Sequence, residues 1–176
     1  MPNPSIFTIA LIFLLLILII TMLKTGVPCA IYIPTPMKVV RRMLKLASLK
    51  PGEILYDLGC GDGRILVTAA KEYGVRAVGI EVNPLLIWLA KRRMRRSGLE
   101  GKIEVLRGNL FDVDLSRADV VTIYLSQYAN NRLKHKLARE LKDGARVVSY
   151  IFPIEGWRPY FKDEDYEIYV YKAPFS

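Results

Sequence analysis

The sequence predicts an α/β protein with a parallel sheet covered by helices on both faces, a C-terminal β-hairpin and one preceding transmembrane helix. From residue 53 onward, short runs rich in Val and Ile alternate with helical patterns, as strands and crossover helices do. Residues 6–23 form an uncharged apolar run, and a glycine-rich turn joins the first predicted strand to its helix. Together these observations predict one globular domain behind one membrane anchor.

The composition fits a single domain with an appendage. The chain has 176 residues, of which 52% are apolar, enough to bury a core. Lys and Arg number 26 against 17 Asp and Glu, and the net charge of +9 favours an anionic partner: nucleic acid, acidic protein or anionic lipid. The cysteines are Cys29 and Cys60, which excludes a secreted disulfide framework and favours a reducing compartment.

Residues 1–23 are predicted to be a short tail followed by a membrane-spanning helix. As a helix, the run at 6–23 rises roughly 27 Å, close to the hydrocarbon thickness of a bilayer. The alternatives are a buried core helix and a cleaved signal peptide, although a signal peptide would begin with basic residues that this chain lacks. Positive residues follow the run from Lys24 onward, so the positive-inside rule places the rest of the chain in the cytoplasm of a single-pass membrane protein.

Residues 24–36 contain three prolines and are predicted to be an extended linker. Thr35 and Pro36 have the pattern of a helix N-cap followed by proline at the first helical position. The helix that follows opens the domain at 37–176 and has an apolar stripe. Its polar side either rests on anionic headgroups or faces solvent. The cations on that side are Lys38, Arg41, Arg42 and Lys45.

The repeating part of the domain is predicted to form five strands and three further helices. The predicted strands are residues 54–58, 77–81, 103–107, 120–125 and 147–152. The predicted helices are residues 64–73, 84–97 and 131–142. This alternation is typical of a parallel sheet with helices on both faces. Residues 157–162 and 166–172 flank an acidic turn and are predicted to form a hairpin that closes the sheet edge.

The glycine-rich turn DLGCGDGR at residues 57–64 is the predicted ligand-binding motif. In open α/β sheets such a turn lets the backbone approach a nucleotide-like ligand at the carboxyl ends of the strands. Glu81 ends the next predicted strand, where a carboxylate accepts hydrogen bonds from ribose hydroxyls. A nicotinamide dinucleotide also fits this pattern, but its pyrophosphate would meet the carboxylates of Asp57 and Asp62. A cationic ligand, S-adenosyl-L-methionine (SAM), is therefore favoured.

DLGCGDGR resembles motif I of the class I (seven-strand) SAM-dependent methyltransferases, which share a Rossmann-like sheet. A narrower resemblance extends from residue 32 to about 159, to the archaeal broad-specificity protein lysine methyltransferase and the mitochondrial lysine methyltransferases that modify membrane proteins such as the c subunit of ATP synthase. It is carried by YIPTP at 32–36, DLGCGDGRI at 57–65, GNLFDVDLS at 108–116 and ARVVSYIFPIEGW at 145–157. The resemblance implies SAM as the cofactor and a protein lysine as the methyl acceptor.

The resemblance also implies roles for individual residues. Glu81 would hold the ribose and Asn109 would face the adenine. The segment carrying Tyr32 and Thr35 would fold over the cofactor. The other cofactor-binding residues implied are Asp57, Gly59, Cys60, Gly61, Asn83 and Leu110. The chain departs from its relatives after the fourth strand, at residues 124–128, and in a shorter hairpin. Both flank the expected acceptor channel, so the resemblance bears on SAM binding more than on the acceptor.

Three aromatic residues are candidates for the wall of an acceptor channel. Tyr124, Tyr128 and Trp157 would dehydrate a lysine and recruit its charged form by cation–π contact. Core or surface packing is the alternative for all three. No spacing of Cys and His indicates a metal, and none is predicted.

The sequence leaves several functions open. The leading hypothesis is a membrane-anchored protein lysine N-methyltransferase whose substrates include membrane-embedded proteins. The alternatives are a methyltransferase for lipids or small hydrophobic molecules and a non-catalytic SAM-binding membrane adaptor. A nucleic-acid substrate is disfavoured because no RNA-binding module is appended, and the arginines at 92–96 are first interpreted as a solvated helix face.

Overall fold

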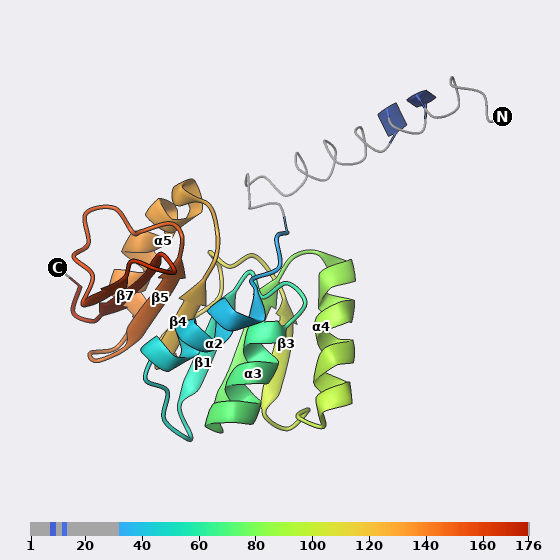
Figure 1. Ribbon diagram of the computed structural model, residues 1–176, viewed down its shortest axis with the longest axis horizontal. Coiled ribbons are helices and arrows are strands. Elements are labelled where there is room, and N and C mark those ends of the chain that lie inside the picture. The colour runs from blue at the N-terminus through green and yellow to red at the C-terminus, as the bar shows by residue number, and fades with distance from the viewer. Residues whose placement is uncertain (1–7, 10–11, 14–31, 176) are drawn as a thin grey trace.

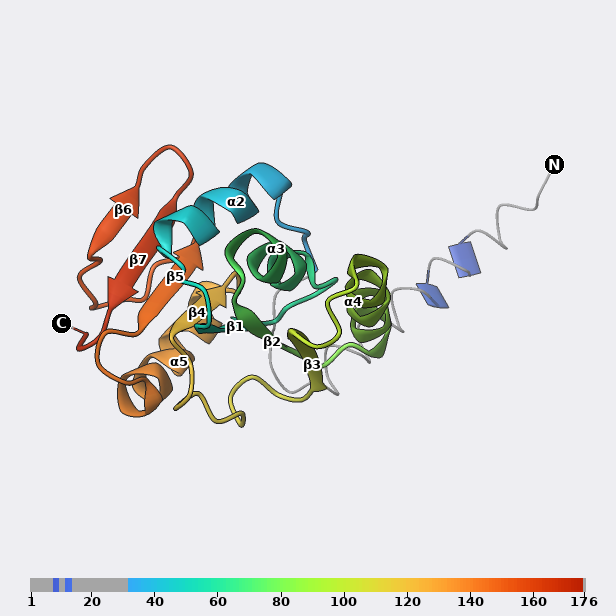
Figure 2. The ribbon, with the colours of Figure 1, turned by 90° about the horizontal axis from the view of Figure 1, so that it is seen from below.

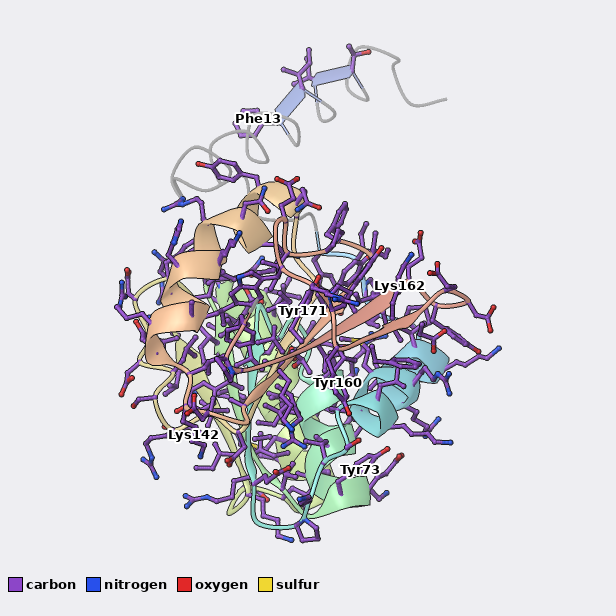
Figure 3. All side chains as sticks on the ribbon, turned by 90° about the vertical axis from the view of Figure 1, so that its left-hand side faces the viewer. Phe13, Tyr73, Lys142, Tyr160, Lys162 and Tyr171 are labelled. Atoms are coloured by element: carbon purple, nitrogen blue, oxygen red, sulfur yellow. The ribbon has the colours of Figure 1, made fainter. Side chains whose placement is uncertain are left out.

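The computed structural model describes residues 8–9, 12–13 and 32–175 (Figure 1). The predicted anchor at 6–23 and the linker up to residue 31 therefore lie largely outside the described residues. Residues 8–9 and 12–13 are helical, and Ile9, Ile12 and Phe13 are exposed (Figure 3). Within the described part of the chain, no helix combines the length and the apolar character needed to cross a membrane.

Seven strands form one mixed sheet in the order β3-β2-β1-β4-β5-β7-β6. Strands β1 to β5 are parallel, and β7 runs antiparallel to both β5 and β6. The strands are β1 (Ile54–Leu58), β2 (Arg76–Glu81), β3 (Ile103–Arg107), β4 (Val120–Ile123), β5 (Arg146–Tyr150), β6 (Phe161–Asp163) and β7 (Ile168–Lys172). The predicted parallel sheet and C-terminal hairpin are confirmed.

Two strands end two residues earlier than predicted, at the edge where the candidate site lies. Strand β4 stops at Ile123 because Ser126 already caps the next helix. Strand β5 stops at Tyr150 because Ile151 has a positive φ of 67°, which breaks the extended backbone. Both early endings shape the loops that follow the strands at this edge.

Four helices are described from residue 32 onward, and two begin differently from the prediction. They are α2 (Met37–Leu46), α3 (Arg64–Tyr73), α4 (Pro84–Ser97) and α5 (Gln127–Glu140). Helix α5 starts four residues early because the Ser126 side chain accepts a hydrogen bond from the backbone N–H of Ala129 at 3.2 Å. The predicted cap of α2 is wrong: Pro36 occupies the N-cap position without a side-chain cap, and Thr35 lies buried before it.

The helices cover both faces of the sheet, as predicted (Figure 2). Helices α2, α3 and α4 pack on one face and α5 on the other, because alternate strand residues point to opposite sides. In β1, Leu55 joins the core under α3, whereas Leu58 joins the core under α5. Tyr171 of β7 is buried in this second core (Figure 3).

The basic side of α2 is partly engaged within the molecule. Arg42 forms an ion pair with the buried Asp163 of β6, and Arg41 pairs with Glu72 of α3 at 3.1 Å. Lys38 lies 5.2 Å from the ring centre of Tyr166. Two of the four predicted headgroup-binding cations therefore have carboxylate partners within the fold.

Candidate active site

The glycine-rich turn follows β1 at the carboxyl edge of the sheet. The backbone N–H groups of Gly59 and Cys60 both donate to the carbonyl of Ile80, at 2.9 and 3.0 Å, which ties the turn to β2. Gly59 and Gly61 have φ values of 82° and 54°, a region that residues with a side chain rarely adopt. The exposed Gly59 therefore presents bare backbone to solvent at the end of β1.

Cys60 contributes no side chain to this surface. Its thiol lies in the core, where a Cβ on Gly79 would come within 2.6 Å of the sulfur. Burial raises the pKa of the Cys60 thiol, and the carboxylates of Asp57 and Glu81 add to this effect. The predicted cofactor role of Cys60 is thus confined to its backbone.

Glu81 is fixed by three backbone N–H groups at the end of β2. One carboxylate oxygen accepts from Gly61 at 3.0 Å, and the other accepts from Val82 and Asn83 at 2.9 Å each. A carboxylate has about four lone-pair sites, so three bonds leave capacity for a further one. The carboxylate is therefore oriented in advance, and it can receive a ribose hydroxyl without rearrangement.

Asp57 lies beneath the turn as a fully buried carboxyl group. The Thr122 hydroxyl of β4 donates to its Oδ1 at 2.8 Å. Burial raises the pKa of Asp57 to about 7, the hydrogen bond from Thr122 opposes this, and the charges of Glu81 and Asp62 add to it. Near neutral pH, a cationic ligand would favour the ionised form of this group.

Asp62 is compensated within the protein. Arg64 donates to both of its oxygens, at 2.9 and 2.8 Å, and Arg93 of α4 forms a second ion pair with it. Burial raises the pKa of Asp62, but the hydrogen bonds from Arg64 and the charge of Arg93 outweigh this and hold the pKa below its usual value. The expectation that Asp62 presents an uncompensated charge to a ligand is wrong, so the electrostatic preference for a cation rests on Asp57 and Glu81.

The segment at 32–36 lies against the glycine-rich turn, at the upper side of the molecule in Figure 1. A Cβ on Gly61 would be 2.8 Å from the ring of Tyr32, so only glycine leaves room for this contact. Arg64 donates to the carbonyl of Thr35 at 2.8 Å. Burial raises the pKa of Tyr32, with the charge of Asp62 adding to it. The sequence predicts Tyr32 and Thr35 over the cofactor, and the structure places both at this turn.

The remaining predicted cofactor residues border the same edge in different ways. The Asn83 side chain caps α4 by accepting from the N–H of Leu85 at 2.9 Å. Asn109 is exposed after β3, and its side-chain oxygen accepts from the N–H of Phe111 at 3.2 Å. Leu110 is buried in the core under α5, so it can offer only backbone to a ligand.

The structure does not bring the three predicted acceptor residues into one cluster. Tyr124, just after β4, packs against Tyr150 at the end of β5 with ring centres 4.7 Å apart. Tyr128 is exposed on the first turn of α5. Trp157 stacks on Phe175 at 3.9 Å and meets Tyr171 edge-on at 5.7 Å, on the α5 side of the sheet. This packing accounts for Trp157 without a substrate.

Several residues at the site were missed from the sequence. The sequence did not single out Thr122, because threonine is common in strands and needs no role in a site to explain it there. Tyr150 looked like an ordinary strand residue, although it pairs with Tyr124. Asn130 is fully buried, and its amide donates to the Phe152 carbonyl at 2.8 Å, which fixes the loop after β5. The sequence signal for Asn130 was its place as a polar residue on the apolar side of a helix, where a buried amide needs hydrogen-bond partners.

Two surface hollows lie away from the glycine-rich turn. One has a volume of about 630 Å³ and is bordered by residues of the C-terminal hairpin, including Arg158, Tyr160 and Lys172. The other, about 290 Å³, borders the amino ends of β1 to β3. Neither contains a predicted cofactor or acceptor residue, so the site is defined by the glycine-rich turn and its buried carboxylates.

Comparison with known proteins decides the family. The profile of the ANTKMT methyltransferase domain matches residues 57–161, which include the glycine-rich turn and Glu81. The chain belongs to this family. A protein-lysine N-methyltransferase of Saccharolobus islandicus is 51% identical over 134 residues, which cover 76% of this chain and 83% of that protein.

More distant relatives share the same domain of this methyltransferase. A human lysine N-methyltransferase, named for the c subunit of ATP synthase, is 36% identical over 131 residues, which cover 74% of this chain but only 55% of the human protein. A solved structure from Salinibacter ruber, described as an RNA methyltransferase in complex with S-adenosyl-L-homocysteine, has a TM-score of 0.78 and 40% identity. The match covers 81% of this chain and 94% of that one. The cofactor of the methyltransferase is therefore SAM, and the predicted class I fold is confirmed.

Proposed function

We propose that this methyltransferase transfers methyl groups from SAM to the side-chain nitrogen of lysine residues in proteins. The observation that carries the proposal is its 51% identity to the protein-lysine N-methyltransferase of Saccharolobus islandicus, over most of both chains. The human relative and a mouse adenine nucleotide translocase lysine N-methyltransferase, 39% identical over 129 residues, are also named for lysine acceptors.

The residues of the turn suit the binding of SAM. Bound SAM supplies a methyl group already activated on a sulfonium, with a good leaving group. Glu81, held by three N–H groups, accepts from the ribose, and Asp57 provides negative charge beneath the turn. Tyr32 lies against Gly61 of the turn, and the Thr35 carbonyl accepts a hydrogen bond from Arg64. The protein therefore contributes mainly the positioning of the cofactor and the acceptor.

The acceptor lysine must arrive without its proton. A free lysine has a pKa of about 10.4, and removal from water lowers it. The pair Tyr124 and Tyr150 offers an aromatic wall near the carboxyl ends of β4 and β5, and Tyr128 offers an exposed ring one loop away. Proton loss to solvent before attack requires no dedicated general base.

The proposal includes attachment to a membrane by residues 6–23, with the catalytic domain on the cytoplasmic side. Its support is the uncharged run, long enough for a bilayer as a helix, and the positive residues that follow it. Such a tether raises the local concentration of membrane acceptors around the site without any new contact. Membrane-embedded proteins with a lysine near the bilayer surface are therefore the proposed substrates.

A second candidate is methylation of RNA. It is favoured by the description of the Salinibacter ruber structure and by the exposed cations Arg92, Arg95 and Arg96 on α4. It competes with the lysine proposal for the same site, so one experiment separates them.

The test incubates full-length protein and methyl-labelled SAM with separate membrane-protein, lipid and RNA fractions. Label is expected in methyl-lysine of the protein fraction, and chemical dimethylation of the lysines beforehand should abolish it. Label that survives this blocking, or that goes into lipid or RNA, contradicts the lysine assignment. The Glu81→Ala variant serves as the control with impaired cofactor binding.

A further inference from the structure

Exposed apolar side chains concentrate at the carboxyl edge of the sheet, around the cofactor site. Among the described residues from 32 onward, ten large apolar side chains are exposed, and seven of them belong to the segment at 32–36, to the loop between β2 and α4 or to the beginnings of helices at this edge. These seven are Tyr32, Ile33, Met37, Val82, Leu85, Trp88 and Tyr128. We call them the apolar rim.

Helix α4 carries the most prominent part of the apolar rim. Leu85 and Trp88 are 63% and 54% exposed, and they lie one turn apart at the helix N-terminus. Arg92 follows Trp88 by four residues, about 6 Å further along the axis, and its guanidinium lies 5.3 Å from the Trp88 ring centre. The helix therefore places apolar groups at the edge and a cation one turn behind them.

Two other helices that begin at the same edge repeat this arrangement. On α5, the exposed Tyr128 is followed four residues later by Arg132, whose guanidinium lies 5.8 Å from the tyrosine ring centre. On α2, the exposed Met37 is followed four residues later by Arg41, which is exposed and pairs with Glu72. An exposed apolar residue followed four residues later by an arginine thus recurs on α4, α5 and α2, and on α2 the arginine is already paired with a carboxylate.

Negative charge at this edge is limited. Asp57 and Glu81 are buried, and Asp62 is compensated by Arg64 and Arg93. The exposed carboxylates on loops that follow the strands include Asp112, Asp114 and Glu155. Further exposed cations, Lys91, Arg95 and Arg96, continue along α4 beside and behind Arg92.

The covalent chain restricts what can face the apolar rim. The uncharged run ends at residue 23, and Tyr32 already lies on the glycine-rich turn. The residues between them, fully extended, span at most about 30 Å. If residues 6–23 cross a bilayer, the carboxyl edge must lie within that distance of its surface.

We propose that the apolar rim docks on an anionic bilayer surface, so that the methyl-transfer site opens onto the membrane. Interfacial apolar groups enter roughly 5–10 Å into the headgroup region, which matches one to two turns of a helix with its tip inserted. Trp88 then lies at the interface, where tryptophan is favoured, and Arg92 and Arg132 meet lipid phosphates. The inference rests on the proposed anchor and restricts the substrates to lysines at the level of the headgroups.

The proposal distinguishes this enzyme from one that is merely tethered. A tethered domain that rotates freely would keep Trp88 in water, whereas a docked domain holds it in the headgroup layer. RNA binding by the cations of α4 would likewise leave Leu85 and Trp88 outside the headgroup layer.

The two tryptophans of the chain allow a direct test. Full-length protein is reconstituted in vesicles of equal parts phosphatidylcholine and phosphatidylglycerol, with bromine atoms on the upper acyl carbons as quenchers, and compared with its Trp88→Phe variant. Up to about half of the wild-type emission should be quenched, because Trp88 is one of two tryptophans and would lie at the interface. The variant should resist quenching, because its remaining Trp157 is stacked on Phe175, away from the apolar rim.

The outcomes separate the anchor, the docking and the chemistry. Full-length protein that fails to float with vesicles overturns the anchor and the docking together. Protein that floats but shows no more quenching than Trp88→Phe overturns the docking and leaves the anchor standing. Protein that binds RNA in solution but floats with vesicles without quenching of Trp88 assigns the cations of α4 to RNA and overturns the docking. Neither readout depends on methyl transfer, so failure of the lysine assignment would be seen separately in the labelling experiment.

Discussion

Replacing Asp57 by Asn should stabilise the protein without cofactor above neutral pH. Asp57 is fully buried, and its pKa rises from 3.8 to about 7 on folding. A carboxyl group with a raised pKa contributes stability that is fully present below pH 3.8 and is lost as the pH rises through about 7. The total loss is about 4 kcal/mol, from 1.36 kcal/mol for each pH unit between those values.

The assay is urea unfolding of wild type and Asp57→Asn at pH 5 and pH 8, without SAM. The unfolding free energy of the variant relative to wild type should increase by about 3 kcal/mol between these pH values, because part of the loss has already occurred at pH 5. Other titrating groups are common to both proteins and largely cancel in the difference. Asn keeps an oxygen for the Thr122 hydroxyl, so the hydrogen bond at 2.8 Å can persist.

A companion variant and a binding measurement test the same reasoning. Thr122→Val removes the hydrogen bond that opposes the rise in pKa, so the loss of stability should extend to higher pH. Asp57→Asn should also bind SAM more weakly at pH 8, since the negative charge beneath the turn is gone. A stability difference that stays constant from pH 5 to pH 8 would refute a buried Asp57 with a raised pKa.

Three further predictions concern the turn and the anchor. Glu81→Ala should weaken SAM binding by about 1.5–3 kcal/mol for each lost charged hydrogen bond, measured by calorimetry on protein shown to be folded, and unchanged affinity would contradict the ribose assignment. Gly61→Ala should destabilise the protein by more than about 1 kcal/mol in thermal unfolding, because φ is 54° and the new Cβ would lie 2.8 Å from Tyr32. The control Gly108→Ala has open space around the new Cβ and should be nearly neutral in the same assay. Deleting residues 1–23 should leave methylation of a soluble protein nearly unchanged and sharply reduce methylation of acceptors in vesicles; equal rates on vesicles would show that the run has another purpose.

Local patterns were sufficient for much of the fold. Helices α3 and α4 and strands β1 and β3 match the predicted residues, because their apolar periodicity and the glycines at their ends act over a few residues. Boundaries failed where a side chain or a dihedral angle intervened. Ser126 moved the start of α5, and the left-handed Ile151 shortened β5.

The acceptor side was the least predictable part of the site. Aromatic residues in loops satisfy both packing and recognition, and sequence spacing does not separate the two uses. The structure gave Trp157 a stacking partner in Phe175, near the C-terminal end of the chain, and gave Tyr124 a partner in Tyr150. The pairing of β7 with β5 brings Phe175 near Trp157, and the pairing of β4 with β5 brings Tyr124 near Tyr150.

The sequence by itself determined the class of sheet and SAM as the cofactor, and it predicted the glycine-rich turn with Asp57 and Glu81 as the carboxylates that face this cofactor. These follow from short-range spacing, since a strand, a turn and the end of the next strand must meet at one edge of a parallel sheet. The tertiary structure decided which charges remain for a ligand. Asp62 is compensated by Arg64, two residues further along the chain, and by Arg93, 31 residues away, while burial raises the pKa of Asp57 to about 7. Burial and ion pairing depend on neighbours that are remote in the chain, and for that reason only the folded protein sets them.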